Sequence, residues 1–485
     1  MDAGKRKIEF GDFQTPEALA ITLCERLTAL GLKPDVVVEP TCGVGAFILA
    51  AVRAFPGARS VLGFEVNREY LHVLAARLYN EPTSERVTLE QADFFSTDWR
   101  AKIDPLKGNL LILGNFPWVT NATQGALGSG NLPQKSNFLG HAGFDAISGK
   151  ANFDISESML LEVLRWFQKR SGDIAMLVKT AVARKVLAHA ERHKDAVREA
   201  FIIGIDAKKS FDASVDACLL VVRLCGDRQR ANYDYTVFAN LDDNIGTRVG
   251  HRDGLTVADL HAFGQGRHLL GNSPEKWRSG VKHDAAAVME FTDSDQGLVN
   301  GLGETVLIEP DYLYPLLKGS DIGSGKEWRS KWVLVTQQAV GQSTQLIRSR
   351  APATWRYLED HAAQLDRRAS IIYAKNPRFS IFGVGEYAFR PWRVAICGLY
   401  KNLRFRLIGP MSGKPVMFDD TVYYLSFDSE DRARSALRSL SSEPAVSLLN
   451  SLIFWDEKRP VKTALLNVLD WSKLEEAEPL QPSLL

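Results

Sequence analysis

The stretch Val36-Val37-Val38-Glu39-Pro40-Thr41-Cys42-Gly43-Val44-Gly45 decides the fold of this chain. Its three valines predict a short buried strand, because β-branched residues pack well on a pleated sheet. The two glycines allow the backbone to approach a ligand closely before a helix begins near Ala46. A strand, a glycine-containing turn and a helix in direct succession predict a βα unit.

Strands and helices keep alternating on both sides of this unit. Before it, residues 16–30 carry apolar side chains at helical spacing, with Thr15 as the expected N-cap. After it, strands are expected at residues 60–64, 86–90, 110–113, 173–178, 201–205 and 217–224, and helices at residues 46–54, 68–78, 153–168 and 181–201. This alternation predicts an α/β fold, a doubly wound and mostly parallel sheet of seven strands with ligands at the carboxyl ends of its strands.

Length and composition point to more than one domain. A chain of 485 residues with 45% apolar content predicts about two domains. The alternation stops after about residue 230, and residues 231–254 are the expected boundary. We therefore expect an α/β domain at residues 1–240 and a second, α+β domain at residues 241–485. The formal net charge of +1 excludes a uniformly basic nucleic-acid coat but permits a local basic surface.

The cysteines and the apolar runs indicate where in the cell the protein is expected to be. Five cysteines are scattered without a CxxC pair, which indicates neither a disulfide framework nor a zinc site and predicts free thiols in a reducing cytoplasm. The N-terminus lacks a hydrophobic targeting segment, and no apolar run approaches the length of a membrane span. Neither secretion nor membrane insertion is expected.

Candidate ligand-binding residues stand where the first three strands end. Gly43 and Gly45 follow the first strand, with a tight βα turn as the alternative reading. Glu65 ends the second strand, where a carboxylate can accept hydrogen bonds from ribose hydroxyls; an exposed turn acid is the alternative. Asp93-Phe94 closes the third strand, with a carboxylate for an adenine amine and a ring for its face. The ordered series is more informative than any single member.

The tetrapeptide Asn115-Phe116-Pro117-Trp118 follows the fourth strand and predicts a site that methylates an exocyclic amine. The lone pair of such an amine is delocalised into the ring, so a catalyst must accept hydrogen bonds from both amine hydrogens. The side-chain oxygen of Asn115 can be one acceptor, and a main-chain carbonyl in the turn fixed by Pro117 can be the other. Trp118 can stack on the base. The alternative is a proline turn with a core tryptophan.

With these motifs the chain resembles the gamma-class DNA adenine methyltransferases of restriction-modification systems, which use S-adenosylmethionine as methyl donor. The resemblance implies that the segment Phe13-Gln14-Thr15-Pro16 contacts the methionine part of the donor. It assigns the following residues to the rest of the cofactor site: Glu39, Pro40, Gly43, Gly45, Phe47, Glu65, Asp93 and Phe94.

The same resemblance assigns the catalytic motif, usually written Asn-Pro-Pro-aromatic, to residues 115–118. Phe116 replaces the first proline, a departure at a position that the family uses through its main-chain carbonyl. Phe211 matches the second aromatic that sandwiches the flipped base, with a hairpin core residue as the alternative.

Two regions are expected to contact DNA. Residues 119–152 form a long polar segment beside the catalytic turn, in which Lys135 and Lys150 are expected to clamp phosphates around the target. Between residues 348 and 414, basic residues outnumber acidic ones and aromatic residues interleave them, which suits a surface for phosphates and base edges. The residues expected to bind DNA there are Arg378, Arg390, Arg393 and Lys401. A solvated charged face over an aromatic core is the alternative.

The resemblance implies methyl transfer to the N6 amine of adenine in double-stranded DNA, a cognate restriction endonuclease as functional partner, and no metal. Cytosine carbon-5 methylation would need a catalytic cysteine, commonly after a proline, and the sequence has no Pro-Cys pair. Relatives that act on the cytosine N4 amine usually carry Ser where Asn115 stands, which favours adenine. N4-cytosine methylation, methylation of RNA or of a protein glutamine, and a catalytically silent DNA-binding subunit remain as alternatives.

Overall fold

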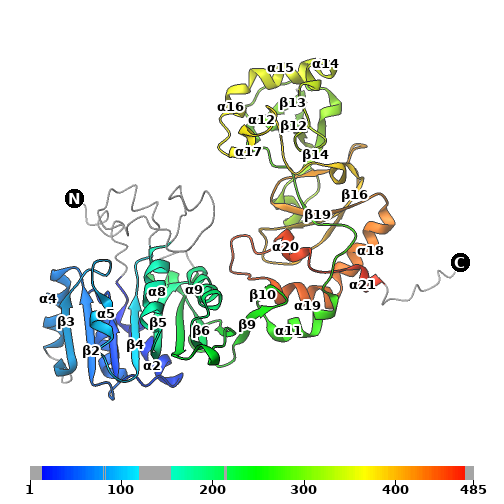
Figure 1. Cartoon of the computed structure of the whole chain (residues 1–485). Coiled ribbons are helices and arrows are strands. Elements are labelled where there is room, and N and C mark those ends of the chain that lie inside the picture. The colour runs from blue at the N-terminus through cyan, green and yellow to red at the C-terminus, as the bar shows by residue number, and fades with distance from the viewer. Residues whose placement is uncertain are drawn as a thin grey trace. The chain divides into compact units, whose positions relative to one another are not determined.

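The computed structural model describes residues 14–79, 81, 84–118, 154–211, 216–295 and 297–475. The chain divides into two compact units, Met1–Thr256 and Val257–Leu485 (Figure 1). The division falls just beyond residues 231–254, where the sequence predicts a boundary. Three expected site residues, Phe13, Lys135 and Lys150, lie outside the described residues.

The first unit is built around a mixed sheet. Its strands are β1 (Val36–Glu39), β2 (Ser60–Glu65), β3 (Val87–Gln91), β4 (Leu110–Asn115), β5 (Ser171–Lys179), β6 (Val197–Ile205), β7 (Ala217–Cys225), β8 (Tyr235–Phe238), β9 (Thr247–Arg252) and β10 (Leu255–Val257). Their order in the sheet is β10-β9-β8-β6-β7-β5-β4-β1-β2-β3. Strands β3, β2, β1, β4 and β5 run parallel, and β7 is antiparallel to both β5 and β6. The antiparallel pairing of β6 with β7 confirms the predicted hairpin.

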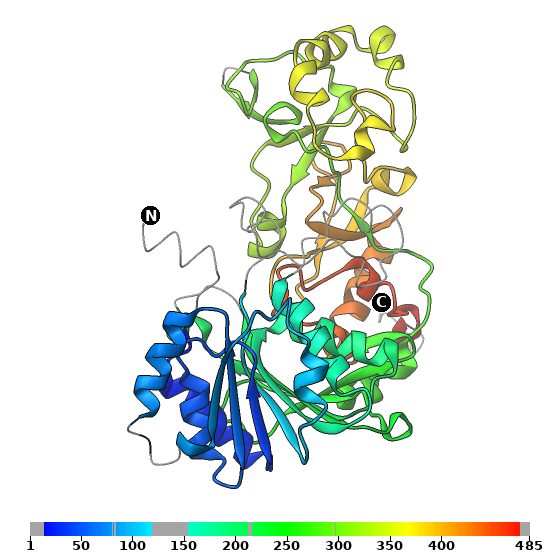
Figure 2. The ribbon, with the colours of Figure 1, turned by 60° about the vertical axis from the view of Figure 1, so that its left-hand side comes forward.

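Helices cover both faces of this sheet (Figure 2). The helices of the first unit are α2 (Glu17–Ala29), α3 (Ala46–Ala54), α4 (Arg68–Leu78), α5 (Trp99–Ile103), α8 (Ile155–Trp166), α9 (Thr180–His193) and α10 (Ala207–Phe211). Strand residues alternate between the faces, so Val37 and Leu111 pack in one core with residues of α2, α3 and α4, while Val36 and Leu110 are buried on the other face. Central strands buried on both faces explain the continuous apolar runs of the sequence.

The predicted count of seven strands is wrong, because β8, β9 and β10 extend the sheet beyond β6 to ten strands. These strands are short and partly exposed: in β8 only the end residues Tyr235 and Phe238 are buried, and β9 and β10 each include exposed residues, so they lack the continuous burial of the central strands. The helix predicted to reach residue 201 ends at His193, where Lys194 adopts a left-handed conformation with φ of 56°. Strand β6 begins at Val197 instead.

The second unit combines two sheets with short helices. One sheet has the order β11-β19-β16-β17 and the other the order β13-β12-β15-β14-β18. The strands are β11 (Arg278–Ser279), β12 (Glu290–Ser294), β13 (Gly297–Asn300), β14 (Leu313–Leu317), β15 (Lys331–Leu334), β16 (Trp392–Cys397), β17 (Arg406–Ile408), β18 (Met417–Phe418) and β19 (Val422–Phe427). The helices are α11 (Leu260–Gly266), α12 (Ala286–Met289), α13 (Gly319–Ser324), α14 (Leu346–Arg350), α15 (Pro352–Asp360), α16 (Ala362–Asp366), α17 (Ile371–Ala374), α18 (Glu430–Ser441), α19 (Glu443–Leu452), α20 (Thr463–Leu466) and α21 (Ser472–Glu475). None of the helices among the described residues has the length and apolar character needed to cross a membrane.

Candidate active site

The turn between β1 and α3 needs glycine at two positions. Gly43 and Gly45 have φ angles of 50° and 84°, a region that side-chain-bearing residues rarely adopt. A Cβ atom on Gly45 would lie 2.1 Å from Cδ1 of Leu74, and one on Gly43 would lie 2.7 Å from Oε1 of Gln14. The main-chain N–H of Val44 donates to the same Gln14 oxygen at 3.3 Å. Gln14 therefore lies against the glycine turn, as expected of a cofactor-site residue.

Glu65, at the carboxyl end of β2, is joined directly to this turn. Its Oε2 accepts a hydrogen bond from the main-chain N–H of Gly43 at 2.9 Å, and its Oε1 accepts from the N–H of Asn67 at 2.9 Å. A carboxylate oxygen can accept more than one hydrogen bond, so these two bonds do not exclude ribose hydroxyls as further donors. The exposed turn acid considered as an alternative does not apply, since Glu65 is only 8% exposed.

A second carboxyl group, that of Glu39, is buried beside the first. Glu39 is 3% exposed, and within the described part of the chain its Oε2 has no hydrogen-bond partner. Burial, with the nearby charge of Glu65 adding to it, raises the pKa of Glu39 well above the ordinary carboxyl value. A positively charged ligand would stabilise the ionised form of both groups. S-adenosylmethionine carries a sulfonium and an α-ammonium group, so these two acids fit it.

The thiol of Cys42, within the same turn, is unsuited to nucleophilic catalysis. It is 4% exposed, and burial raises its pKa, with the charges of Glu39 and Glu65 adding to the effect. The reactive form of cysteine is the thiolate, which this environment disfavours.

The expected adenine-binding pair follows β3. Asp93 uses both carboxylate oxygens locally, accepting from the N–H of Phe95 at 3.1 Å and from the hydroxyl of Ser96 at 3.0 Å. The ring of Phe94 is only 7% exposed, whereas Phe95 is 41% exposed. Val66, which follows Glu65 and is 50% exposed, is an apolar neighbour of this region that the sequence reasoning missed. An exposed apolar residue next to the expected ribose acid is the signal that could have found it.

Phe94 belongs to an aromatic cluster that also holds the catalytic turn. Its ring packs edge-on against Phe116, with centroids 5.4 Å apart, and lies 5.4 Å from Trp99 and 6.0 Å from Trp166. The indole of Trp99 donates to the main-chain oxygen of Phe94 at 2.7 Å. Phe116 is 1% exposed. Phe116 is thus fixed by packing, and the cluster joins the end of β3 to the end of β4.

Asn115 is the last residue of β4, and its amide group is oriented by the segment that precedes α2. Asn115 Nδ2 donates to Oγ1 of Thr15 at 3.3 Å. The prediction that Thr15 caps α2 is wrong, because Pro16 occupies the N-cap position and makes no side-chain cap. The hydroxyl of Thr15 therefore contacts the Asn115 side chain and does not cap α2.

The two expected base-stacking rings contact each other. Trp118 is 7% exposed, and its ring lies edge-on to Phe211, the last residue of α10, with centroids 5.2 Å apart. The indole N–H of Trp118 donates to the main-chain oxygen of Leu177 at 3.4 Å. Two rings in direct contact leave no space for a base between them, so a base can enter there only after they separate.

Two further residues assigned to the cofactor site have structural positions. Phe47 lies in α3, is 1% exposed and packs in the core of the first unit. Pro40 is buried in the turn that follows β1. Neither side chain is presented to a ligand in this arrangement.

The residues expected to bind DNA in the second unit differ in exposure. Lys401 is exposed. Arg378 is exposed and pairs with Asp366 at 2.6 Å, and the exposed Arg390 lies 3.5 Å from Asp428. Arg393 is the exception.

The side chain of Arg393 is only 1% exposed, which contradicts the expected contact with DNA. Its guanidinium donates to the main-chain oxygens of Ala388, Trp392 and Arg390, and it lies 5.4 Å from the ring centre of Tyr424. Burial lowers its pKa to about 10. Arg393 lies in β16, whose residues 393–397 are all buried, so the prediction of a surface cation at this position is wrong.

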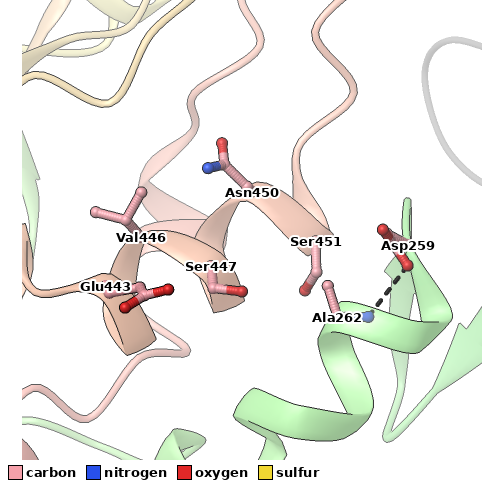
Figure 3. Close-up of a pocket in the computed structure, with 7 residues that line it drawn as sticks. All are labelled: Asp259, Ala262, Glu443, Val446, Ser447, Asn450 and Ser451. Carbon is pink, nitrogen blue, oxygen red and sulfur yellow. Dashed lines mark hydrogen bonds between the residues drawn. The ribbon is translucent and has the colours of Figure 1, made fainter.

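A separate pocket of about 340 Å³ lies within the second unit, between the start of α11 and α19 (Figure 3). It is lined by Asp259, Ala262, Glu443, Val446, Ser447, Asn450 and Ser451. The Asp259 carboxylate caps α11 by accepting from the main-chain N–H groups of His261 and Ala262. None of the predicted site residues lines this pocket, and of its two acids, Asp259 and Glu443, the first caps α11.

Comparison with known proteins identifies relatives along nearly the full length of the chain. The chain is 46% identical to the type II methyltransferase M.NspV of Nostoc sp. over 470 residues. This alignment covers 96% of the chain and 97% of the relative. The chain is 32% identical over 117 residues to the type II methyltransferase M.XamI of Xanthomonas campestris pv. amaranthicola, covering 24% of this chain and 21% of that one. No protein-family model matches the chain.

Among solved structures, the chain is similar to the type IIL restriction-modification enzyme MmeI, determined in complex with DNA. The TM-score is 0.56 at 11% identity, and the match covers 96% of this chain and 69% of that one. At this identity the likeness concerns the fold.

Proposed function

The chain belongs to the type II DNA methyltransferases of restriction-modification systems, and from this premise we propose that it methylates the N6 amine of adenine within a short duplex recognition sequence. The donor in this proposal is S-adenosylmethionine, which supplies a methyl carbon bound to a sulfonium sulfur. Methylation of the host DNA would protect it from a cognate restriction endonuclease.

The orientation of Asn115 is the observation that carries the choice of an exocyclic amine. Its amide nitrogen is directed to Thr15, so the oxygen of the same group faces the other way, as an acceptor for an amine hydrogen must. The main-chain carbonyl of Phe116 is the second acceptor in this proposal. Adenine is preferred over the cytosine N4 amine because relatives acting on cytosine usually carry Ser at this position.

The remaining site residues have positioning and binding roles in the proposal. Gln14, Thr15 and the turn at Gly43 and Gly45 hold the methionine part of the donor, while Glu65 and the Asp93-Phe94 pair hold its ribose and adenine. Trp118 and Phe211 separate to sandwich a base that has rotated out of the duplex, as enzymes acting on bases require. Catalysis then consists mainly of positioning and of electrostatic complementarity to the forming ammonium.

The second unit reads the DNA sequence in this proposal. Its exposed cations at Arg378, Arg390 and Lys401 are proposed to contact phosphates or base edges. Lys135 and Lys150 are proposed to contact the phosphates around the target. In this proposal the first unit, Met1–Thr256, carries out methyl transfer and the second unit, Val257–Leu485, recognises the DNA.

The test is methylation of plasmid DNA by the purified chain with labelled S-adenosylmethionine, followed by chromatography of the nucleosides. The expected product is N6-methyladenine. Asn115→Ala should lower the rate at least about 100-fold while binding of S-adenosylmethionine persists. Asn109→Ala is the control, because Asn109 precedes the same strand at its opposite end and bonds Lys33 and Asp173 there.

The outcomes separate the alternatives. N4-methylcytosine as the product would contradict the choice of base, and label in RNA or protein instead of DNA would contradict the substrate class. DNA binding without any transfer by the wild-type chain would indicate a silent DNA-binding subunit. Full activity of Asn115→Ala would refute the role of that residue.

A further inference from the structure

The end of β5 carries a side chain that reaches the catalytic turn. Lys179 is the last residue of β5 and the N-cap of α9. Its Nζ donates to the main-chain oxygen of Trp118 at 3.1 Å and pairs with Oδ2 of Asp154 at 2.6 Å. The side chains of Lys179 and Asp154 are 24% and 8% exposed. One ammonium group therefore joins the residue that ends the catalytic turn to the residue that precedes α8.

The acidic partner of this ammonium is itself fixed. Asp154 is the N-cap of α8, and its Oδ1 accepts from the N–H of Ser156 at 3.1 Å and from the hydroxyl of Ser156 at 2.6 Å. The carboxylate cannot rotate without losing these bonds. Because the pair is mostly shielded from water, its attraction is screened less than that of a surface ion pair.

Trp118 is held to β5 at a second point as well. Its indole N–H donates to the main-chain oxygen of Leu177, and Leu177 is the residue of β5 that lies opposite Asn115 in the parallel register. The start of the catalytic turn is therefore fixed to β5 by sheet pairing, and its end is fixed to the same strand by Lys179 and Leu177. A turn held at both ends presents its acceptors in one arrangement.

We propose that Lys179 is a positioning residue for methyl transfer, which holds the Trp118 end of the catalytic turn by bridging its carbonyl to Asp154. This inference rests on the proposed function, since it concerns the same site. A positive charge is required, because a neutral side chain would leave the Asp154 carboxylate without its counter-ion in a shielded position. A misplacement of a reacting group by about 1 Å can cost about 100-fold in rate.

The experiment compares Lys179→Met with Lys179→Arg and with a matched control, Lys185→Met. Lys185 lies in α9 and pairs with Glu157 of α8 at 3.0 Å, so it joins the same two helices, but its side chain is 56% exposed and it makes no bond to the catalytic turn in the described structure. The quantities to measure are the single-turnover rate on plasmid DNA, the affinity for S-adenosylmethionine and the midpoint of thermal unfolding.

Lys179→Met should lower the single-turnover rate about 10- to 100-fold with affinity for S-adenosylmethionine unchanged within about twofold. Lys179→Arg should recover most of the rate, and Lys185→Met should keep the wild-type rate. Lys179→Gln replaces the Met variant if the latter does not fold, with the same loss expected.

Three results would overturn the inference: a wild-type rate in Lys179→Met or its Gln substitute, an equal loss in Lys185→Met, or a loss of cofactor affinity that accounts for the loss of rate. Absence of transfer by the wild-type chain would overturn the proposed function itself, and the inference with it.

Discussion

At the scale of single residues, the buried acid Glu39 links stability to pH. The raised pKa of Glu39 means that the folded chain keeps a proton there at pH values where the unfolded chain has lost it. The free energy of unfolding contributed by this group therefore falls as the pH rises from about 4.5, the ordinary value, to the raised pKa. Above the raised pKa the full cost of burying the charge is present.

Glu39→Gln should remove this dependence. We expect the variant to be more stable than the wild type at neutral pH by about 1–3 kcal/mol, with the difference disappearing near the ordinary carboxyl pKa. Its affinity for S-adenosylmethionine should fall, because glutamine cannot ionise to the carboxylate that a cationic ligand would stabilise. Chemical denaturation across pH and calorimetric binding measure both effects.

The exposed Glu85 supplies the control for this experiment, since Glu85→Gln changes the same charge without burial. A stability difference between wild type and Glu39→Gln that does not vary with pH would contradict the linkage argument.

At the scale of elements, the junction of β1 with α3 depends on Gly45. Gly45→Ala places a Cβ 2.1 Å from the Leu74 side chain and imposes a φ of 84° on alanine. The expected loss in the free energy of unfolding is about 2–4 kcal/mol, together with weaker binding of S-adenosylmethionine because the turn must move. Denaturant titration and calorimetry measure these changes.

Gly57 offers the matched position for comparison, because no atom lies within 4 Å of a Cβ built there. Gly57→Ala should leave both quantities close to those of the wild type. Equal stability of the two alanine variants would show that the turn at Gly45 accommodates a side chain.

The central elements were predictable because local signals and burial agree there. Strands β1 and β4 carry short apolar runs, β2 is apolar apart from Gly63 and its two ends, and breaker residues bound β1 and β4, so the predicted and observed ranges nearly coincide. Strands β8 to β10 were missed because they are only three to six residues long and lie in a largely polar segment where the alternation of strands and helices has stopped. The boundary between α9 and β6 was missed because residues 194–201 satisfy helical spacing as well as strand alternation.

The site was predictable in its motifs and unpredictable in its contacts. Gln14, Gly43 and Glu65 come together as the order of motifs implies. Lys179 bridges Trp118 and Asp154, which are far apart from it in the sequence. The only related signal in the sequence is a lysine at the end of an apolar strand. Arg393 is buried because both faces of β16 are covered, which a count of basic residues does not reveal.

At the scale of the whole molecule, binding of DNA should depend on the exposed cations and not on the buried one. Lys401→Ala should weaken binding and reduce the slope of log affinity against log salt by about one. Arg393→Met should leave that slope unchanged and instead lower the free energy of unfolding by about 1–3 kcal/mol, because buried carbonyl oxygens lose their donors.

Fluorescence anisotropy with labelled duplex DNA at several salt concentrations gives the slopes, and denaturation gives the stability. A reduced slope in Arg393→Met, measured well below its unfolding transition, would show that Arg393 contributes to DNA binding. An unchanged slope in Lys401→Ala would show that Lys401 does not contact DNA phosphates.

The packing of Phe116 against Phe94 bears on how this sequence can evolve and be redesigned. Returning position 116 alone to the proline usual in such motifs would empty a space that the ring now fills beneath the aromatic cluster. Proline at position 116 is therefore expected to need compensating changes at Phe94 or Trp166. A design that places proline at position 116 alone is expected to lower the free energy of unfolding. A library that varies positions 94, 116 and 166 together can include combinations that refill the space.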